Sequence, residues 1–452
     1  MGDRRLDSWK EIAEYLQRDV STAIRWERRG LPIHRVPGAT RQAVFAYPSE
    51  IDNWMAGRRA ATDVPLAETP PEDEANRRRA NDPKVSELGR RGRRRIPLAM
   101  GATLLVVAGL TRLLWAPSAS GDGQIARVER RIKSIVALAD DGAELWSFAT
   151  EGRLQIPSGG PLQPEGMGIW VGDLDGDGAD EALVSAALAD GPQVGRDTLY
   201  CFSHRGRVLW QRQLDDVWRF AGGAYGAPWN LGRVAVVQVG GEARIVWIQN
   251  HHTWWPSVLA VLDGQGQRLS TFVHSGHFYA VAGMQAPTGP VILAAGISNY
   301  HAAAVLAVLD AHDAAGAGPE PEDSAYACLS CPAGAPTRYF VFPRSEFNVA
   351  SGDPYNRVAV LRVISEEGFE VQTYEDRYQT ALGAVYRFGR DFALLQAAFS
   401  DGRADQHRWH ESRGSLRHSL ADCPESSPPH PRRWMPGVGW TELKPGSVLP
   451  SQ

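Results

Sequence analysis

Cysteine is scarce in this chain of 452 residues: there are four, and the first of them is Cys201. So sparse a set excludes a small scaffold held together by disulfides. The chain also lacks a glycine-rich phosphate loop, a GxSxG nucleophile motif and an HExxH motif, which argues against P-loop NTPases, serine hydrolases and zinc proteases. The net charge of −4 shows no chain-wide basic excess. We therefore expect a protein that is not an enzyme.

One long apolar run, residues 96–116, reads IPLAMGATLLVVAGLTRLLWA. It has the length of a helix that crosses about 30 Å of hydrocarbon. An arginine cluster (residues 90–95) precedes it, and no basic residue follows until Arg127. The positive-inside rule then places residues 1–95 in the cytoplasm. We expect a single transmembrane helix in a bacterial inner membrane, with Arg112 reaching outward to the interface; a buried helix of a soluble domain is the alternative.

The run separates segments of different composition. Residues 59–95 are rich in charge and proline and poor in bulky apolar residues, so we expect a disordered basic linker. Residues 117–445 should lie outside the cytoplasm, and all four cysteines fall there, where disulfides form. Residues 1–58 should form a separate cytoplasmic domain.

Residues 1–58 have the pattern of a small α+β domain. SWKE at 8–11 fits a capping box, and apolar residues then recur at helical spacing as far as Leu16. A second helix is expected to begin near Ser21, and Gly30-Leu31-Pro32 ends it. Alternating apolar residues surround a Pro-Gly turn at 37–38, which predicts a hairpin. The expected fold is a winged helix-turn-helix.

The stretch DVSTAIRWERRGLPIHR, residues 19–35, resembles the second helix and wing of the excisionase and MerR superfamily. It carries one aromatic residue, Trp26, where true MerR regulators carry a pair, so the excisionase-like branch is closer. The resemblance implies DNA binding. Independently of it, the second helix and the wing present side chains that donate to phosphates or base edges; they are Ser21, Thr22, Arg25, Arg28, Arg29, Arg35 and Arg41. A protein-binding domain with a solvated basic face is the alternative.

The region beyond residue 125 contains short apolar runs punctuated by Gly, Asp and Asn. Residues 134–148, 198–211 and 257–272 each read as a strand, a turn with glycine and a second strand, and residues 304–316 repeat the first strand. Hairpins that recur in this way, with no helical periodicity between them, predict an all-β domain, most simply a β-propeller. An array of β-sandwiches is the alternative, because the last third repeats poorly. Leu-Trp pairs at 145–146 and 209–210 are expected to pack between blades.

The sharpest motif of the chain is an Asp/Gly loop at 173–181, DLDGDGADE. Asp173, Asp175 and Asp177 stand at alternate positions, followed by a glycine, which gathers hard oxygen ligands as calcium requires. An EF-hand would need a bidentate glutamate at the twelfth position, where Val184 stands, and its flanks would be helices. The loop instead resembles the calcium loops of FG-GAP repeats in integrin-type propellers. That resemblance implies a structural calcium ion held by Asp173, Asp175 and Asp177, the carbonyl of Ala179 and Glu181.

Cys328 and Cys331 form a CxxC pair without the helical setting of a thioredoxin-like site. A local disulfide is expected, and half of a zinc site with Cys423 and a histidine is the alternative. Taken together, these features predict a membrane-anchored, DNA-binding transcriptional regulator whose outer domain senses an unknown protein or glycan. A homodimer is compatible with this layout. The alternative is a membrane-anchored binding or adhesion protein whose small domain contacts a cytoplasmic protein.

Overall fold

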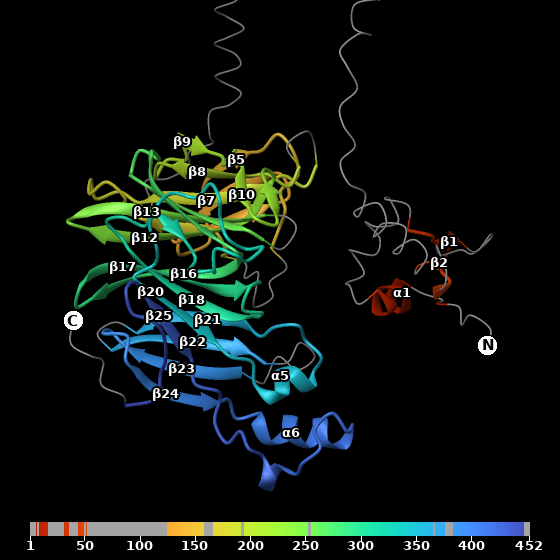
Figure 1. Cartoon of the computed structure of the whole chain (residues 1–452). Helices are drawn as coiled ribbons and strands as arrows, with labels where there is room; N and C mark the ends of the chain where they lie inside the picture. The colour runs from red at the N-terminus through yellow and green to blue at the C-terminus, as the bar shows by residue number, and fades with distance from the viewer. Residues whose placement is uncertain are drawn as a thin grey trace, which may run out of the picture. The chain divides into compact units, whose positions relative to one another are not determined.

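The structure is a computed structural model, and it describes residues 6, 9–16, 31–35, 44–48, 51, 124–157, 166–190, 194–251, 255–364, 367–375 and 383–446. The chain divides into two compact parts, which we name the N-terminal unit (Met1–Ile96) and the β unit (Pro97–Gln452). The described part of the N-terminal unit contains α1 (Trp9–Tyr15), β1 (His34–Arg35) and β2 (Val44–Phe45), and the two strands pair antiparallel (Figure 1). Its small core consists of Ile12, Ala13, Leu31, Val44, Ala46 and Ile51.

The fold class expected from the sequence is wrong for the part of the chain that the structure describes. That part is mostly β, with 50% strand and 8% helix, and it shows no winged helix-turn-helix. The apolar run at 96–116 lies outside the described residues, as does the expected second helix. Among the described residues, no helix has the length and apolar character needed to cross a bilayer. The fold class is set by the strands of the β unit, because they make up most of the described residues.

Five sheets make up most of the β unit, and neighbouring strands in them are antiparallel apart from one parallel pair. The first sheet contains β3 (Arg127–Arg131), β4 (Ser134–Leu138) and β5 (Glu144–Ala149). The second contains β6 (Ile169–Gly172), β7 (Glu181–Ala187), β8 (Asp197–Phe202) and β9 (Val208–Arg212). The third has the order β12 (Trp229–Val239), β13 (Glu242–His251), β14 (Ser257–Leu262), β15 (Arg268–His274) and β19 (Gly316–Ala317).

The remaining strands complete the β unit. The fourth sheet has the order β16 (Gly276–Ala286), β17 (Gly289–Ser298), β18 (Ala303–Asp310), β20 (Arg338–Phe342), β25 (Arg432–Met435) and β26 (Gly439–Glu442). The fifth contains β21 (Arg357–Ile364), β22 (Gly368–Tyr374), β23 (Gly383–Gly389) and β24 (Leu394–Phe399). A separate hairpin is formed by β10 (Trp218–Phe220) and β11 (Gly223–Tyr225). Central strands such as β14 are buried along their whole length, which explains their continuous apolar sequences.

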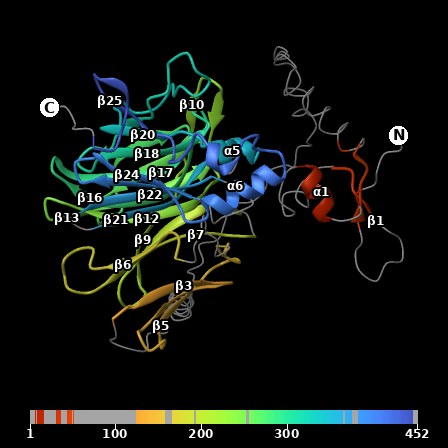
Figure 2. The ribbon, with the colours of Figure 1, turned by 90° about the horizontal axis from the view of Figure 1, so that it is seen from below.

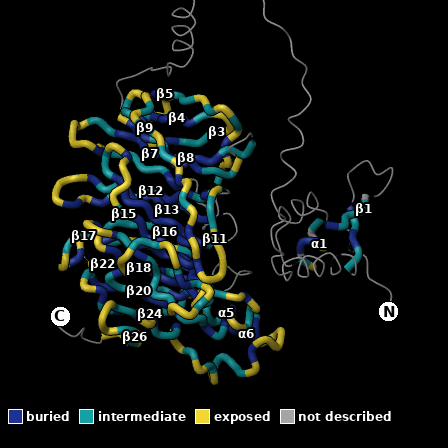
Figure 3. The backbone as a smooth tube through the Cα atoms, turned by 45° about the horizontal axis from the view of Figure 1, so that its top comes forward, coloured by how far each residue is buried: buried dark blue, intermediate teal, exposed yellow. Residues whose placement is uncertain are grey.

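The sheets pack face to face in chain order, and one hydrophobic cluster fills each gap between successive sheets. Trp146 and Val184 meet between the first and second sheets, and Leu183 and Ile245 between the second and third. The ring of Phe340 in the fourth sheet lies 5.3 Å from that of Phe388 in the fifth. The first and fifth sheets lie at opposite ends of the stack (Figures 1 and 3). A propeller would bring these two together, so the propeller expectation is corrected: hairpin recurrence does not encode closure.

The expected hairpins are present. Antiparallel pairing joins β4 to β5, β8 to β9 and β14 to β15, and each connecting turn has a glycine at positive φ. Gly206, in the β8–β9 turn, lies against the fully buried ring of Trp146 from the first sheet. Trp210 lies in the same way against Gly266 in the β14–β15 turn and donates its indole N–H to the carbonyl of Gly264 at 2.9 Å. Leu145, Trp146 and Trp210 therefore pack between sheets, whereas Leu209 is exposed.

Two helices and a 3-10 turn lie between strands in the last quarter of the chain, one before β21 and two between β24 and β25, and were not expected from the sequence. They are α5 (Glu346–Ala350), α6 (Arg403–Ser412) and η1 (Leu420–Asp422), and α5 and α6 lie side by side (Figure 2). The buried face of α6 consists of Gln406, His407 and His410. Because this face is polar, it gives no apolar periodicity that a sequence pattern could reveal.

Candidate functional site

The Asp/Gly loop connects β6 to β7 in the second sheet, and its three aspartates converge. Carboxylate oxygens of Asp173, Asp175 and Asp177 lie within 4.8 Å of one another. Backbone N–H groups orient them: Gly176 and Gly178 donate to the two carboxylate oxygens of Asp173 at 2.7 and 3.0 Å. Three exposed carboxylates held together in this way repel one another, and a hard divalent cation would neutralise that repulsion.

Glu181, the last predicted ligand, is placed differently. It begins β7, is buried, and accepts a hydrogen bond from the N–H of Leu174 at 3.1 Å. Burial raises the pKa of this carboxyl group, and the nearby aspartates add to that effect. Glu181 thus stabilises the loop through its hydrogen bond to Leu174 and is not part of the converging carboxylate group. The N–H of Ala179 donates to Asp177 at 2.8 Å, which fixes the peptide whose carbonyl was the fifth expected ligand.

All but one of the predicted DNA-binding residues lie outside the part of the chain that the structure describes. The residues outside it are Ser21, Thr22, Arg25, Arg28, Arg29 and Arg41, and Arg35 is in β1.

Cys328 and Cys331 form a disulfide with a Cα–Cα distance of 5.7 Å. The disulfide loop pairs with β10, since the N–H of Leu329 donates to the carbonyl of Arg219 at 2.7 Å. Cys201 and Cys423 are free thiols.

A continuous row of aromatic rings joins loops and strand ends from separate parts of the β unit; we name it the aromatic row. Successive ring centroids are 4.5 Å apart for Tyr225 and Trp255, 4.9 Å for Trp255 and Tyr326, and 6.3 Å for Tyr326 and Tyr300. The row continues through His301 to Trp440, at 4.8 and 5.1 Å. Tyr300 and Trp440 are 39% and 37% exposed, so the row reaches solvent where these two rings lie.

The aromatic row also carries polar groups. The Nε2 atom of His301 is buried and has no hydrogen-bond partner. Burial, together with the nearby charge of Arg432, lowers the pKa of His301 to about 4, so its ring is neutral near pH 7. The guanidinium of Arg432 lies 5.2 Å from the Trp440 ring. Rings with hydrogen-bonding groups at their edges bind ligands that have both apolar faces and hydroxyl groups.

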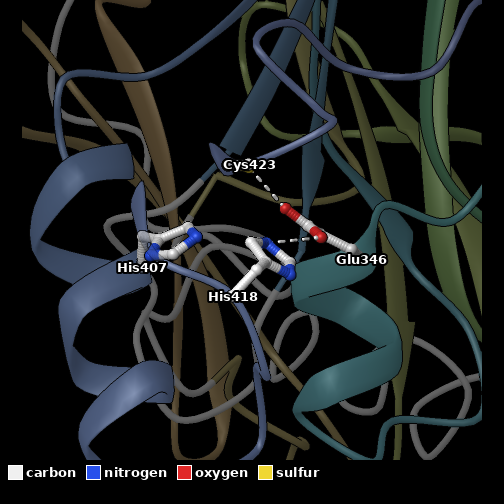
Figure 4. A group of neighbouring side chains, drawn as sticks. All are labelled: Glu346, His407, His418 and Cys423. Atoms are coloured by element: carbon white, nitrogen blue, oxygen red, sulfur yellow. Dashed lines mark hydrogen bonds and ion pairs between the residues drawn. The ribbon is translucent and has the colours of Figure 1, made fainter. Parts of the chain in front are cut away.

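Two further groups were missed by the sequence patterns. Asp197 is buried inside the second sheet and accepts hydrogen bonds from the N–H of Gly232 at 2.7 Å and from Gln249 at 3.1 Å. Burial raises the pKa of Asp197. The second group brings together four side chains at the helical end of the β unit (Figure 4), and they are Glu346, His407, His418 and Cys423. In the sequence, only Cys423 of this group was singled out, as a partner of the CxxC pair and a histidine in the alternative zinc site.

No family model matches this chain, and no curated protein matches it. Among solved structures, one of a protein of unknown function from Bacteroides caccae is similar over 62% of this chain and 92% of its own, at 11% identity and a TM-score of 0.22. A eukaryotic initiation factor is similar over 64% of this chain and 66% of its own, at 9% identity and a TM-score of 0.26. Similarity this low supports no conclusion about function.

Proposed function

We propose that the β unit is a binding module, not an enzyme, and that the aromatic row is its ligand surface. The main support for this proposal is that loops and strand ends from five separate segments meet and place connected rings at the surface. Loops held by a rigid sheet scaffold are common positions for binding residues. The Cys328–Cys331 disulfide closes a short loop two residues beyond Tyr326, next to the row.

The chemistry of the row favours a glycan. A sugar ring offers an apolar C–H face to an aromatic ring and a rim of hydroxyl groups to polar neighbours. Trp440 and Tyr300 provide exposed rings, and His301 and Arg432 provide polar edges beside them. A protein ligand is the competing outcome of the test.

A glycan array followed by titration, read by tryptophan fluorescence on the full chain, tests this proposal. Trp440→Ala and Tyr300→Ala should each weaken glycan binding by about tenfold or more, the cost of removing an aromatic anchor. Trp409→Ala is the matched control, since this ring lies on α6 and outside the row. Undiminished binding in both row variants, or capture of proteins but no glycan, would contradict the proposal.

The calcium loop belongs to the same proposal as a structural element. It supports the module by fixing the β6–β7 connection, and Leu174 of that loop is buried in the cluster between the second and third sheets. Calcium binding there would stabilise the sheet stack and would not activate water.

We further propose that residues 1–58 bind DNA, which would make the protein a regulator that responds to the ligand of the β unit. The support is the concentration of donors between Ser21 and Arg41 in the sequence. A gel-shift of the full chain against genomic fragments tests it: the paired substitution Arg25→Ala and Arg28→Ala should abolish a salt-sensitive shift. Absence of any salt-sensitive binding by the wild type would favour contact with a cytoplasmic protein.

A further inference from the structure

Four side chains with metal-binding atoms converge at the helical end of the β unit. Glu346 is the first residue of α5, His407 lies in α6, His418 lies between α6 and η1, and Cys423 follows η1. One ligand atom from each of the four lies within 4.8 Å of the other three. Figure 4 shows the side chains directed toward a common centre, with one ring nitrogen of His407 facing His418.

The buried imidazole of His407 has ring nitrogens without hydrogen-bond partners. Its side chain is fully buried, and neither ring nitrogen makes a hydrogen bond. The Oε2 atom of Glu411 lies 3.7 Å from Nδ1, which is too far for a hydrogen bond but places a carboxylate beside that nitrogen. Buried polar groups without partners are rare in folded proteins. A metal ion bound to the other nitrogen would satisfy the ring, and Glu411 would orient it from behind.

The other three side chains already contact one another through their ligand atoms. The thiol of Cys423 donates to Oε1 of Glu346 at 2.7 Å, and Nε2 of His418 lies 3.3 Å from Oε2 of the same carboxylate. A guanidinium N–H of Arg403 donates to the sulfur of Cys423 at 3.0 Å. Metal binding would replace the thiol–carboxylate hydrogen bond, and the thiol proton would pass to solvent.

From these contacts we propose that Glu346, His407, His418 and Cys423 bind a zinc ion. One sulfur, two imidazole nitrogens and one carboxylate oxygen are the donor types of tetrahedral zinc sites, whereas calcium and magnesium prefer oxygen alone. A thiolate and a carboxylate balance the two charges of the ion, because both histidines bind as neutral rings. Four protein donors fill the coordination sphere, so the ion is structural.

The site explains how three short elements are held together. Among the described residues, the buried apolar cluster of this region consists of Phe347 and Leu416, and the partly buried Ala350 and Phe399 pack against it. Zinc would join α5, α6 and the segment around η1 in place of a larger core. A surface pocket of about 520 Å³ is lined in part by Glu346, Ser415 and Glu425, so one of the four ligands borders it.

The test uses the full chain purified without a metal-affinity column. Elemental analysis should find about one zinc per chain, removable by a chelator. Cobalt added to the apo protein should give a sulfur-to-cobalt charge-transfer band and the intense visible bands of four-coordinate cobalt. Absence of both bands, with no zinc retained by the wild type, overturns the proposal and leaves a metal-free hydrogen-bonded cluster.

Variants locate the ion. Cys423→Ser should remove the charge-transfer band, and His407→Ala should abolish stoichiometric zinc; zinc retained by both variants overturns the assignment. The matched controls are Cys201→Ala, a buried free thiol elsewhere, and His312→Ala, an exposed histidine. Glu411→Gln keeps all four ligands and should weaken zinc binding by about tenfold, the usual effect of losing an outer carboxylate partner.

Discussion

Replacing the turn glycines by alanine measures how much the packing between sheets contributes to stability. Gly142, Gly206 and Gly266 occupy equivalent positions in three hairpin turns, with φ of 82°, 76° and 73°. A Cβ atom on Gly206 would lie 2.6 Å from Cγ of Trp146, and one on Gly266 would lie 2.8 Å from Cδ2 of Trp210. A Cβ atom on Gly142 has nothing within 4 Å. The three turns therefore share one backbone cost and differ in packing.

The expected magnitudes follow from that difference. An alanine at positive φ costs about 1–2 kcal/mol, and all three variants bear this cost. Overpacking against a tryptophan ring adds about 1–3 kcal/mol, and only the variants at Gly206 and Gly266 bear this cost. Trp146 is fully buried and Trp210 is partly buried, so the cost should be larger at Gly206. Gly142→Ala should thus lower the free energy of unfolding by the smaller amount, and Gly206→Ala by roughly twice as much or more.

Urea denaturation of the full chain, followed by far-UV circular dichroism and by tryptophan fluorescence, provides the measurement. Trp146→Phe combined with Gly206→Ala is the companion variant, because the smaller ring should recover part of the packing cost. If Gly142→Ala and Gly206→Ala destabilise equally, within the usual error of about 0.5 kcal/mol, the tryptophan does not restrict the turn and the reasoning is refuted.

Three other outcomes are expected. Calcium at a hundredfold excess over its dissociation constant should stabilise the wild type by about 2.7 kcal/mol, and Asp173→Asn with Asp177→Asn should abolish this gain while Asp263→Asn, in another turn, keeps it; an equal gain in all three proteins counts against the loop. Burial lowers the pKa of His274 to about 3 from its usual 6.5, so unfolding takes up a proton between these values. Stability should therefore fall below pH 6.5 by about 1.4 kcal/mol per pH unit for this group, and His274→Gln should flatten that slope in acid titrations followed by calorimetry. Reduction of Cys328–Cys331, or Cys328→Ser, should weaken ligand binding at the aromatic row more than it lowers the melting temperature, because so short a loop gains little from cross-linking. An equal loss of binding in Cys201→Ala, which removes a free thiol elsewhere, would show that the effect does not come from this disulfide.

Local features of the chain were open to prediction from the sequence. The hairpins at 134–148, 198–211 and 257–272 were found because strand, glycine turn and strand are contiguous, and the turn chemistry is set by neighbouring residues. The convergence of Asp173, Asp175 and Asp177 follows from alternate spacing in one short loop. The winged helix-turn-helix and the membrane helix were inferred from apolar periodicity and run length. The described residues show no winged helix-turn-helix, and the run at 96–116 lies outside them, so the membrane helix stays a prediction.

Arrangement in space was decided by the tertiary structure. Whether hairpins close into a ring or form a stack depends on the twist and contact of sheets far apart in the chain, and no local pattern records it. The aromatic row draws on five segments, and the proposed zinc ligands stand at 346, 407, 418 and 423, so neither has a recognisable spacing. The helix that carries His407 buries polar side chains, which hides it from any search for an apolar face. The sequence by itself determined strands, turns and one acidic loop, because those depend on neighbours in the chain; the sites built from distant residues exist only through the packing of sheets and helices.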